Sequence, residues 1–311
     1  MERSERAGSG RRAGFGRRAA VWATAIAVIG ALSGCTGAGA AGGSGSGDGD
    51  DPARSSDGAS SAPSGTAGTQ SADTERDDFT GKAGTPPDAS VWTAQTGAGG
   101  WGNEELQTYT RDAVALDGKG HLAITAHIGG TASAPTYTSG RITTQGKYEF
   151  TNGTLSARIK LPDGPGLLPA FWLLGADVGQ VGWPRAGEID IVEAPHGTGS
   201  TSHNIHGPNR YLGSQDVPVS ADVTHDPKLS EGFHVFSVTK TADSITMRID
   251  GDVAAELDRA TAPPTLDWVF DQPMNILFSL AIGGKWPGNP TSATPSTSRM
   301  LIDWIQLTRT S

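Results

Sequence analysis

An antiparallel β-sandwich is the fold class that the sequence predicts for residues 78–311. Two segments, 155–161 and 245–250, alternate apolar and polar residues with a period of two, which is typical of half-buried strands. Other short segments rich in β-branched and aromatic residues are separated by Gly, Asp, Asn and Pro, and no run of ten or more residues has a helical period. Many short strands and few helices indicate an all-β sandwich or jelly roll. We expect strands at 121–128, 147–150, 155–161, 188–193, 234–239, 245–250, 274–282 and 300–307.

The first 34 residues have the layout of a secretory signal peptide. Six arginines are followed by an apolar stretch and then by small residues, so we expect residues 1–34 to be removed during export. The residues Leu32-Ser33-Gly34-Cys35 resemble the lipobox of bacterial lipoproteins, in which Cys35 becomes the lipidated N-terminus and a membrane anchor. The alternative is that Cys35 is incidental at an ordinary cleavage site, and either the Sec or the twin-arginine route is open. The sequence thus predicts an exported bacterial protein, either a cell-surface lipoprotein or a secreted one.

Residues 35–77 have the composition of a flexible, disordered linker. Of the 37 residues from 36 to 72, 29 are Gly, Ser, Ala or Thr, and almost none of the others can be buried in a core. A flexible chain of roughly 50 residues spans about 40 Å. We therefore expect this segment to hold the folded domain away from its anchor.

The charge of the chain differs between its leader and its body. Residues 1–34 carry six arginines and two glutamates, which leaves 18 basic and 31 acidic side chains, a net charge of −13, after residue 34. Such an acidic body repels phosphate backbones, so nucleic acid is not expected as a partner. The single cysteine excludes a disulfide within the chain.

One predicted strand places three acids among apolar residues. In a regular strand Glu188 and Asp190 share one face, whereas Glu193 points to the other. A bulge in which Ile191 and Val192 lie opposite a single residue of the neighbouring strand would turn all three carboxyl groups to one face. Long side chains over a concave sheet could then bring the two glutamate carboxyls to about 5–5.5 Å, the separation of a retaining glycosidase.

Three acids this close together cannot all ionise freely. At least one pKa is therefore expected to rise, as an acid catalyst near neutral pH requires. The alternative is a solvated outer strand with harmless acids. Like charges without an interleaved Lys or Arg destabilise a sheet unless a site uses them, so the pattern favours a catalytic site.

This strand and its flanks resemble glycoside hydrolase family 16, in particular its bacterial endo-β-1,3-glucanases (laminarinases). The acids are similar to the bulged E-x-D-x-x-E motif of that family. The resemblance implies a concanavalin-like jelly roll with a concave substrate cleft and retention of anomeric configuration. It also implies Glu188 as nucleophile, Glu193 as general acid and base, and Asp190 as the residue that poises both. The similar flanks are residues 78–81, 101–107, 139–144, 169–174, 183–184 and 283–289.

Several further residues match positions that hold sugar in this family. Indole rings suit stacking on the C–H faces of sugars, and polar side chains would bind hydroxyl groups, with His206 as a hydrogen-bond donor near the nucleophile. Alternatively, Arg141 pairs with an acid and Asn103 holds a turn. The resemblance assigns substrate binding to Asn103, Arg141, Trp172, Trp183, His206 and Trp286, with Trp101 as a further candidate. The remaining tryptophans of the domain are expected to pack: Trp92, Trp268 and Trp304.

A metal ion is expected only in a structural role, and no cofactor is expected for catalysis. No H-E-x-x-H helix is present, and His196 and His203 are expected to be solvated loop histidines, so the pattern does not support a metal-dependent hydrolase. The family resemblance implies a structural calcium ion (Ca2+), with Asp303 as a side-chain ligand joined by Asp78 and the Gly120 carbonyl. The alternative is that Asp303 is a simple solvent-facing acid.

Together these features predict a surface-tethered, monomeric, retaining endo-β-1,3-glucanase that cuts laminarin-like polysaccharides outside the cell. Two alternatives are open: the same fold acting on mixed-linkage β-glucan or a galactan, and a non-catalytic glycan-binding sandwich. The paired glutamates argue against a binding module, because such a module needs no acids beside a stacking surface.

Overall fold

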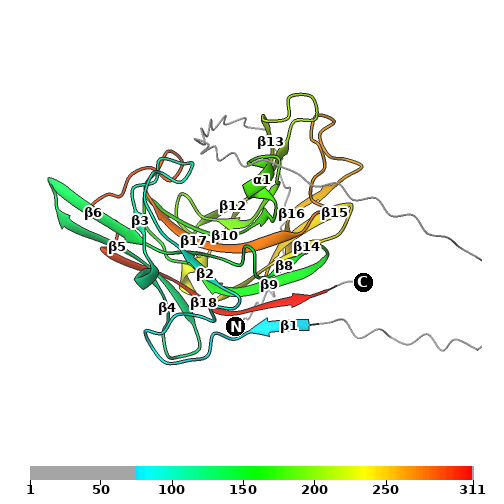
Figure 1. The fold of residues 1–311 in the computed structure, drawn as a ribbon. Coiled ribbons are helices and arrows are strands. Elements are labelled where there is room, and N and C mark those ends of the chain that lie inside the picture. The colour runs from blue at the N-terminus through cyan, green and yellow to red at the C-terminus, as the bar shows by residue number, and fades with distance from the viewer. Residues whose placement is uncertain (1–73, 310–311) are drawn as a thin grey trace, which may run out of the picture.

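The computed structural model describes residues 74–309, which form two mainly antiparallel β-sheets packed face to face (Figure 1). The predicted all-β sandwich is therefore confirmed. The signal peptide, Cys35 and most of the predicted linker lie outside the described residues. Thr74–Asp77, which the composition assigns to the linker, instead form strand β1 and pair with the C-terminal strand β18 (Thr297–Thr308). This strand is polar and is held by backbone pairing, which composition alone does not reveal.

Sheet A contains ten strands: β1, β3 (Thr108–Tyr109), β4 (Val114–Leu116), β5 (Leu122–Thr131), β6 (Ala134–Ser139), β9 (Gly153–Lys160), β14 (His234–Lys240), β15 (Ser244–Ile249), β16 (Asp252–Asp258) and β18. Their order is β16-β15-β14-β9-β18-β5-β6-β3, with β1 beside β18 and β4 beside β5. The edge strand β3 has only two residues, so it leaves few unpaired backbone groups at that edge of the sheet.

Sheet B contains eight strands: β2 (Thr93–Gln95), β7 (Arg141–Thr143), β8 (Glu149–Phe150), β10 (Leu167–Gly175), β11 (Glu188–Glu193), β12 (Ser200–Pro208), β13 (Asp216–Thr224) and β17 (Met274–Ile282). Their order is β13-β12-β11-β10-β17-β7-β2, with β8 beside β17. Helical structure in the described residues is limited to α1 (Val178–Val181) and two 3-10 turns, Arg111–Ala113 and Leu229–Glu231. No helix within residues 74–309 has the length and hydrophobicity needed to cross a membrane.

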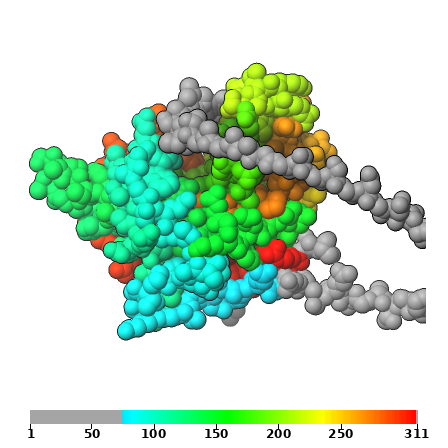
Figure 2. Space-filling view, viewed as in Figure 1, coloured from blue at the N-terminus to red at the C-terminus, as the bar shows by residue number. Residues whose placement is uncertain are grey.

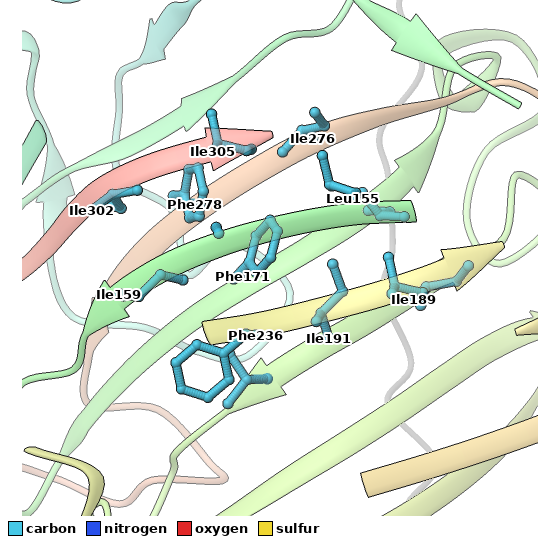
Figure 3. Packing of buried hydrophobic residues seen from close by; sticks show 14 of the residues in the cluster. Leu155, Ile159, Phe171, Ile189, Ile191, Phe236, Ile276, Phe278, Ile302 and Ile305 are labelled. Atoms are coloured by element: carbon cyan, nitrogen blue, oxygen red, sulfur yellow. The ribbon is translucent and has the colours of Figure 1, made fainter. Parts of the chain in front are cut away.

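The hydrophobic core lies between the two sheets (Figure 3). On sheet B, Phe171 and Phe278 lie opposite each other on neighbouring strands, and their rings stack with centroids 4.7 Å apart. Such cross-strand aromatic pairs stabilise a sheet beyond their buried area. Trp92 and Trp268 are buried, as expected. Trp304 is not part of the core: it is half-buried, with the Arg76 guanidinium 4.5 Å from its ring.

Strand β10 is buried on both faces. Its Phe171 and Leu173 belong to the core, whereas Ala170 and Trp172 form a separate apolar cluster with Leu277 of β17. Because both faces are apolar, the strand reads as a continuous hydrophobic run without alternation. The second cluster lies on the face of sheet B that is turned away from sheet A, which we call the open face.

The open face of sheet B is concave, because its strands curve upward at their ends in the ribbon view (Figure 1). Two hairpins, β5–β6 and β12–β13, project from the body of the domain (Figure 2). The ribbon places them on either side of the open face (Figure 1). The curvature and the two hairpins thus frame the open face.

Candidate active site

A β-bulge in β11 turns its acids toward the open face. Against β12, Glu188 lies opposite His206, Asp190 opposite Asn204 and Glu193 opposite Ser202. Ile191 and Val192 therefore share a single partner position, and the register also shifts against β10. Ile189, Ile191 and Val192 are all fully buried in the core. The predicted bulge is confirmed, and it removes the conflict of parity that a straight strand would have.

A tight turn leads into this strand. Gly187 adopts a φ of +75°, and a Cβ at this position would lie 2.9 Å from a methyl group of Val269 and 3.2 Å from the Phe270 ring. Any other residue would strain the backbone and push against the core. The turn therefore fixes where Glu188 begins the strand.

The Asp190 carboxyl interacts with the carboxyls of both glutamates, and polar residues of β12 meet Asp190 and Glu193. The Asn204 amide donates to Glu193 Oε2 over 2.8 Å. His206 Nε2 lies 3.5 Å from Asp190 Oδ2, and one polar atom each of Glu188, Asp190 and His206 lie within 4.8 Å of one another. Asp190 thus lies between the two glutamates and within reach of Glu188.

Burial raises the pKa of each of these carboxyl groups. For Glu193 the pKa rises to about 7, although the hydrogen bond from Asn204 opposes the shift. For Asp190 the pKa lies well above its usual range, because burial is reinforced by the charges of both glutamates. Burial also raises the pKa of Glu188, but the positive charges of His206 and Arg141 oppose that rise. Among the three acids, Asp190 thus most strongly favours its protonated form, whereas the cations beside Glu188 favour the ionised form of that carboxyl.

His206 is held as a cation beside these acids. Its Nδ1 lies 2.7 Å from Asp216 Oδ2 on the next strand, and the indole of Trp183 packs on its ring with centroids 5.8 Å apart. Burial by itself lowers the pKa of His206, but the hydrogen bond to Asp216 and the charge of Glu188 raise it to about 9. The protonated imidazole can therefore donate from Nε2 toward the acids at neutral pH.

Arg141 forms the centre of an aromatic cluster on the other side of the open face. Its guanidinium carbon lies 4.6 Å from the centroid of Trp172 and 4.9 Å from that of Trp101. Its Nε donates to Gln95 Oε1 over 2.5 Å. Burial lowers the pKa of Arg141, and the negative charges of Glu105 and Glu188 oppose that shift. The indole of Trp172 in turn donates to Ser279 Oγ over 3.2 Å.

A partly buried acid adjoins this cluster. Glu105 accepts hydrogen bonds from Gln107 Nε2 at 2.6 Å and from Tyr109 at 3.0 Å. Burial raises the pKa of Glu105, although both hydrogen bonds oppose the rise. The loop that carries Glu105 and Gln107 is fixed to sheet B, because Gln107 Oε1 accepts a hydrogen bond from the Ile282 amide over 2.7 Å.

Asn103 and Trp286 belong to two loops that contact each other. Asn103 Oδ1 accepts from the Trp286 amide over 3.3 Å, and the Asn103 carbonyl accepts from the Lys285 amide over 2.9 Å. Gly284 allows this approach, because a Cβ there would lie 2.6 Å from the Asn103 carbonyl oxygen. These contacts match the alternative in which Asn103 holds a turn. Trp286, on the loop that Asn103 contacts, is half-buried.

The residues expected to hold calcium do not fit such a site. Asp303 forms an ion pair with Arg158, and Asp78 forms one with Arg76 at 2.6 Å. Calcium takes six to eight oxygen ligands, whereas here a guanidinium neutralises each carboxylate. Within residues 74–309, a close group of potential metal ligands is found at Glu188, Asp190 and His206, which are the acids and the histidine already described.

The two loop histidines differ from each other. His196 is exposed, as expected, but His203 is 1% exposed and lies in the middle of β12. The expectation of a solvated loop is wrong for His203, because its ring nitrogens meet buried partners on its own strand and on the adjacent strand β11. Sequence reasoning also missed four residues of the site. Gln95, Asn204 and Asp216 meet their partners through strand pairing, whereas Glu105 meets Gln107 and Tyr109, which are close to it along the chain.

Comparisons with known proteins agree with this geometry. The sequence profile of the glycosyl hydrolases family 16 matches residues 102–306. A beta-glucanase of Rhodothermus marinus is 32% identical over 239 residues, which is 72% of this chain and 80% of that protein. The laminarinase catalytic domain from Thermotoga maritima MSB8 is 35% identical with a TM-score of 0.68, and the match covers 76% of this chain and 97% of that one. An endo-beta-1,3-glucanase from Pyrococcus furiosus is 36% identical with a TM-score of 0.67, over 76% and 94% of the two chains.

Proposed function

The chain belongs to glycosyl hydrolase family 16, and from this membership and its acid cluster we propose that it is a retaining endo-β-1,3-glucanase with Glu188 and Glu193 as the catalytic pair. The observation that carries the proposal is the bulge, which brings both glutamates to the open face on either side of Asp190. Two acids in different electrostatic environments are what a double displacement requires. The names of the matched laminarinase and endo-1,3-glucanase support β-1,3-glucan as the substrate.

The first step forms a glycosyl-enzyme. The Glu188 carboxylate attacks the anomeric carbon, and the bond from that carbon to the leaving oxygen breaks. Glu193 transfers its proton to that oxygen, so the departing chain leaves as a neutral alcohol. A pKa of about 7 for Glu193 supports this role, and the cations His206 and Arg141 support an ionised nucleophile.

The second step releases the sugar. Water gives a proton to the Glu193 carboxylate and attacks the anomeric carbon, and the bond to Glu188 breaks. Glu188 and Glu193 are then back in their starting protonation states. The two successive inversions at the anomeric carbon give net retention of configuration. Asp190, with its strongly raised pKa, is protonated and donates to the Glu188 carboxylate, which holds the nucleophile in place.

The sugar chain lies across the open face. The half-buried Trp183 and Trp286 supply stacking surfaces, the buried Trp172 supports Arg141, and Arg141 and His206 supply donors for hydroxyl groups. Asn103 acts through the loop of Trp286, which it holds. The cluster of Arg141 with two indoles supports a rigid binding surface on one side of the acids.

The proposal is tested by digesting a panel of purified glycans with wild-type enzyme. We expect release of reducing ends and a ladder of products from laminarin, with retention of anomeric configuration in proton NMR of the first products. Equal or greater activity on mixed-linkage β-glucan or a galactan would overturn the substrate assignment. Binding of laminarin without any turnover would favour a glycan-binding sandwich.

We further propose that the enzyme is exported and held on the cell surface through a lipid on Cys35. The signal-like residues 1–34 and the linker composition support this proposal. The intact mature protein, purified from its native membrane, should begin at Cys35 and carry the added mass of a diacylglyceryl group. A mature N-terminus elsewhere would contradict the anchor.

A further inference from the structure

His203 lies at the centre of the site's scaffold without facing the substrate. It is the residue of β12 opposite the bulge, between Ser202, which pairs with Glu193, and Asn204, which pairs with Asp190. Its side chain is 1% exposed. A buried imidazole needs partners for both ring nitrogens, and those partners indicate what the residue does.

One partner is the bulge itself. A bulge places an extra residue in the strand and leaves part of its backbone outside the regular ladder. Here His203 Nδ1 lies 2.6 Å from the carbonyl oxygen of Ile191, one of the two bulge residues. A carbonyl only accepts hydrogen bonds, so the proton is on Nδ1.

The other ring nitrogen is fixed by a chain of contacts. His203 Nε2 lies 3.0 Å from Thr201 Oγ1, which lies 2.8 Å from His225 Nε2. With its proton on Nδ1, a neutral His203 accepts from the Thr201 hydroxyl at Nε2, and that hydroxyl accepts from His225. Burial lowers the pKa of His203 to about 4, which agrees with a neutral ring. The contacts therefore permit one direction of donation, which ends at the bulge carbonyl.

The neighbouring residue of β12 holds the other end of the same unit. Asn204 donates to the Glu193 carboxyl from the open face, while His203 holds the Ile191 carbonyl from the core side. Only Val192 separates Ile191 from Glu193 along the chain, so a change in the bulge backbone moves the Glu193 carboxyl relative to the sugar. A displacement of 1 Å at a catalytic group can cost about 100-fold in rate.

We propose that His203 is a positioning residue that sets the Glu193 carboxyl for proton transfer by holding the Ile191 carbonyl. The inference rests on the proposed function, since it concerns the acid and base of that reaction. It assigns the imidazole no contact with substrate. Loss of the Nδ1 donor frees the bulge, and Glu193 then protonates the leaving oxygen less well while Glu188 still attacks.

The consequence depends on the leaving group. Departure of a sugar alcohol needs a proton from Glu193, whereas departure of dinitrophenolate does not, because that anion is stable without one. The value of kcat/KM reports the steps up to formation of the glycosyl-enzyme. A fault in acid catalysis therefore lowers kcat/KM for glucan far more than for a dinitrophenyl β-1,3-gluco-oligosaccharide, whereas general loss of structure lowers both alike.

The test compares three variants of His203 on these two substrates. His203→Phe keeps a ring of similar size and removes both polar atoms. His203→Asn keeps an amide donor near the place of Nδ1, and His203→Gln moves the donor toward the place of Nε2. We expect His203→Phe to lower kcat/KM for laminarin by about 10–100-fold and that for the dinitrophenyl substrate by less than about threefold. His203→Asn should recover most of the loss, and His203→Gln should not.

Wild-type enzyme and Glu193→Ala separate the possible failures. Lack of glucan cleavage by wild type would overturn the proposed function, and lack of the leaving-group pattern in Glu193→Ala would overturn the acid assignment. If both controls behave as expected, equal losses on the two substrates, or none, in His203→Phe would overturn the role of His203. Should His203→Phe not fold, as judged by circular dichroism, the contrast between the Asn and Gln variants decides, and equal leaving-group patterns in these two would overturn the proposal.

Discussion

The two sides of the open face are built by different means. On one side, which we call the acid side, Glu188, Asp190 and Glu193 are fixed by paired strands and by polar partners on β12 and β13. On the other, the aromatic side, Arg141 is held between Trp101 and Trp172 by stacking. The acid side places carboxyl groups at the glycosidic bond that is cleaved, and the aromatic side offers a binding surface for the glucan chain. Changes on the acid side should therefore act on turnover, and those on the aromatic side on binding.

The largest effect is expected for Glu188→Gln. The amide is similar in shape to the carboxyl but cannot form the glycosyl-enzyme, so kcat should fall by at least about 10⁴-fold. Affinity for laminarin, measured by calorimetry, should stay within about threefold, because the aromatic side is intact. Unchanged turnover would exclude Glu188 as the nucleophile.

A smaller effect is expected for Asp216→Asn, and it should appear as a pH shift. Without the Asp216 charge, the pKa of His206 falls, because burial is then opposed only by the charges of Glu188 and Glu193. The positive charge that favours the ionised form of Glu188 is therefore weakened. The direct repulsion between Asp216 and Glu188 also disappears, but this contribution is smaller than that of His206.

The acidic limb of the kcat/KM profile should therefore move upward by about one pH unit, which lowers the rate about tenfold on that limb. The basic limb, which reflects Glu193 with its pKa of about 7, should also move upward, because the charge of His206 lowers that pKa too. Asp222→Asn is the matched control: Asp222 lies on the same strand and accepts from Ser202 instead of His206. A similar shift in both variants would show that the effect is not carried by His206.

On the aromatic side, Arg141→Lys is expected to raise KM by about fivefold with kcat nearly unchanged. Lysine keeps the positive charge near Glu188 but loses the planar stack with two indoles. Arg141→Met removes the charge as well, so it should lower kcat in addition. Initial-rate measurements on laminarin check both, and a fall in kcat for the lysine variant would mean that the two sides are not separable.

The smallest effect is expected on sheet A, away from both sides. Asp303 and Arg158 form a partly exposed ion pair, so Asp303→Asn should lower the free energy of unfolding by about 0.5–1 kcal/mol. Neither kcat nor KM should change. Chelation with EDTA should leave the Tm of the wild type unchanged. A fall in Tm would instead support a structural calcium site.

The sequence was most informative where residues alternate in type. The bounds of β11 and its bulge follow from the clash between three acids and the period of two, since apolar residues must reach the core while acids must not. Strand β10 could not be found in this way, because a strand buried on both faces has no alternation. Strand β1 is polar and depends on its partner β18.

Residues that act through distant partners were the least predictable. Asp216 contacts His206 only because the β12–β13 hairpin brings the two strands together. His203 looks like any polar histidine near glycines until the bulge supplies a carbonyl for it. The side chains expected as calcium ligands instead meet arginines: Arg158 reaches Asp303 from a distant strand, whereas Arg76 lies two positions from Asp78. Local sequence shows which groups are present, whereas tertiary pairing decides what each group meets.

Val192 adds length to β11 without being needed for orientation. If this residue were deleted, plain alternation would still direct Glu188, Asp190 and the following glutamate to one face. The insertion therefore leaves the direction of the acids as it was and lengthens the strand between the nucleophile and the proton donor. It also exposes the Ile191 carbonyl to the ring of His203. The bulge at Val192 is thus a point at which the distance between the two glutamate carboxyls can change without any change in the side chains themselves.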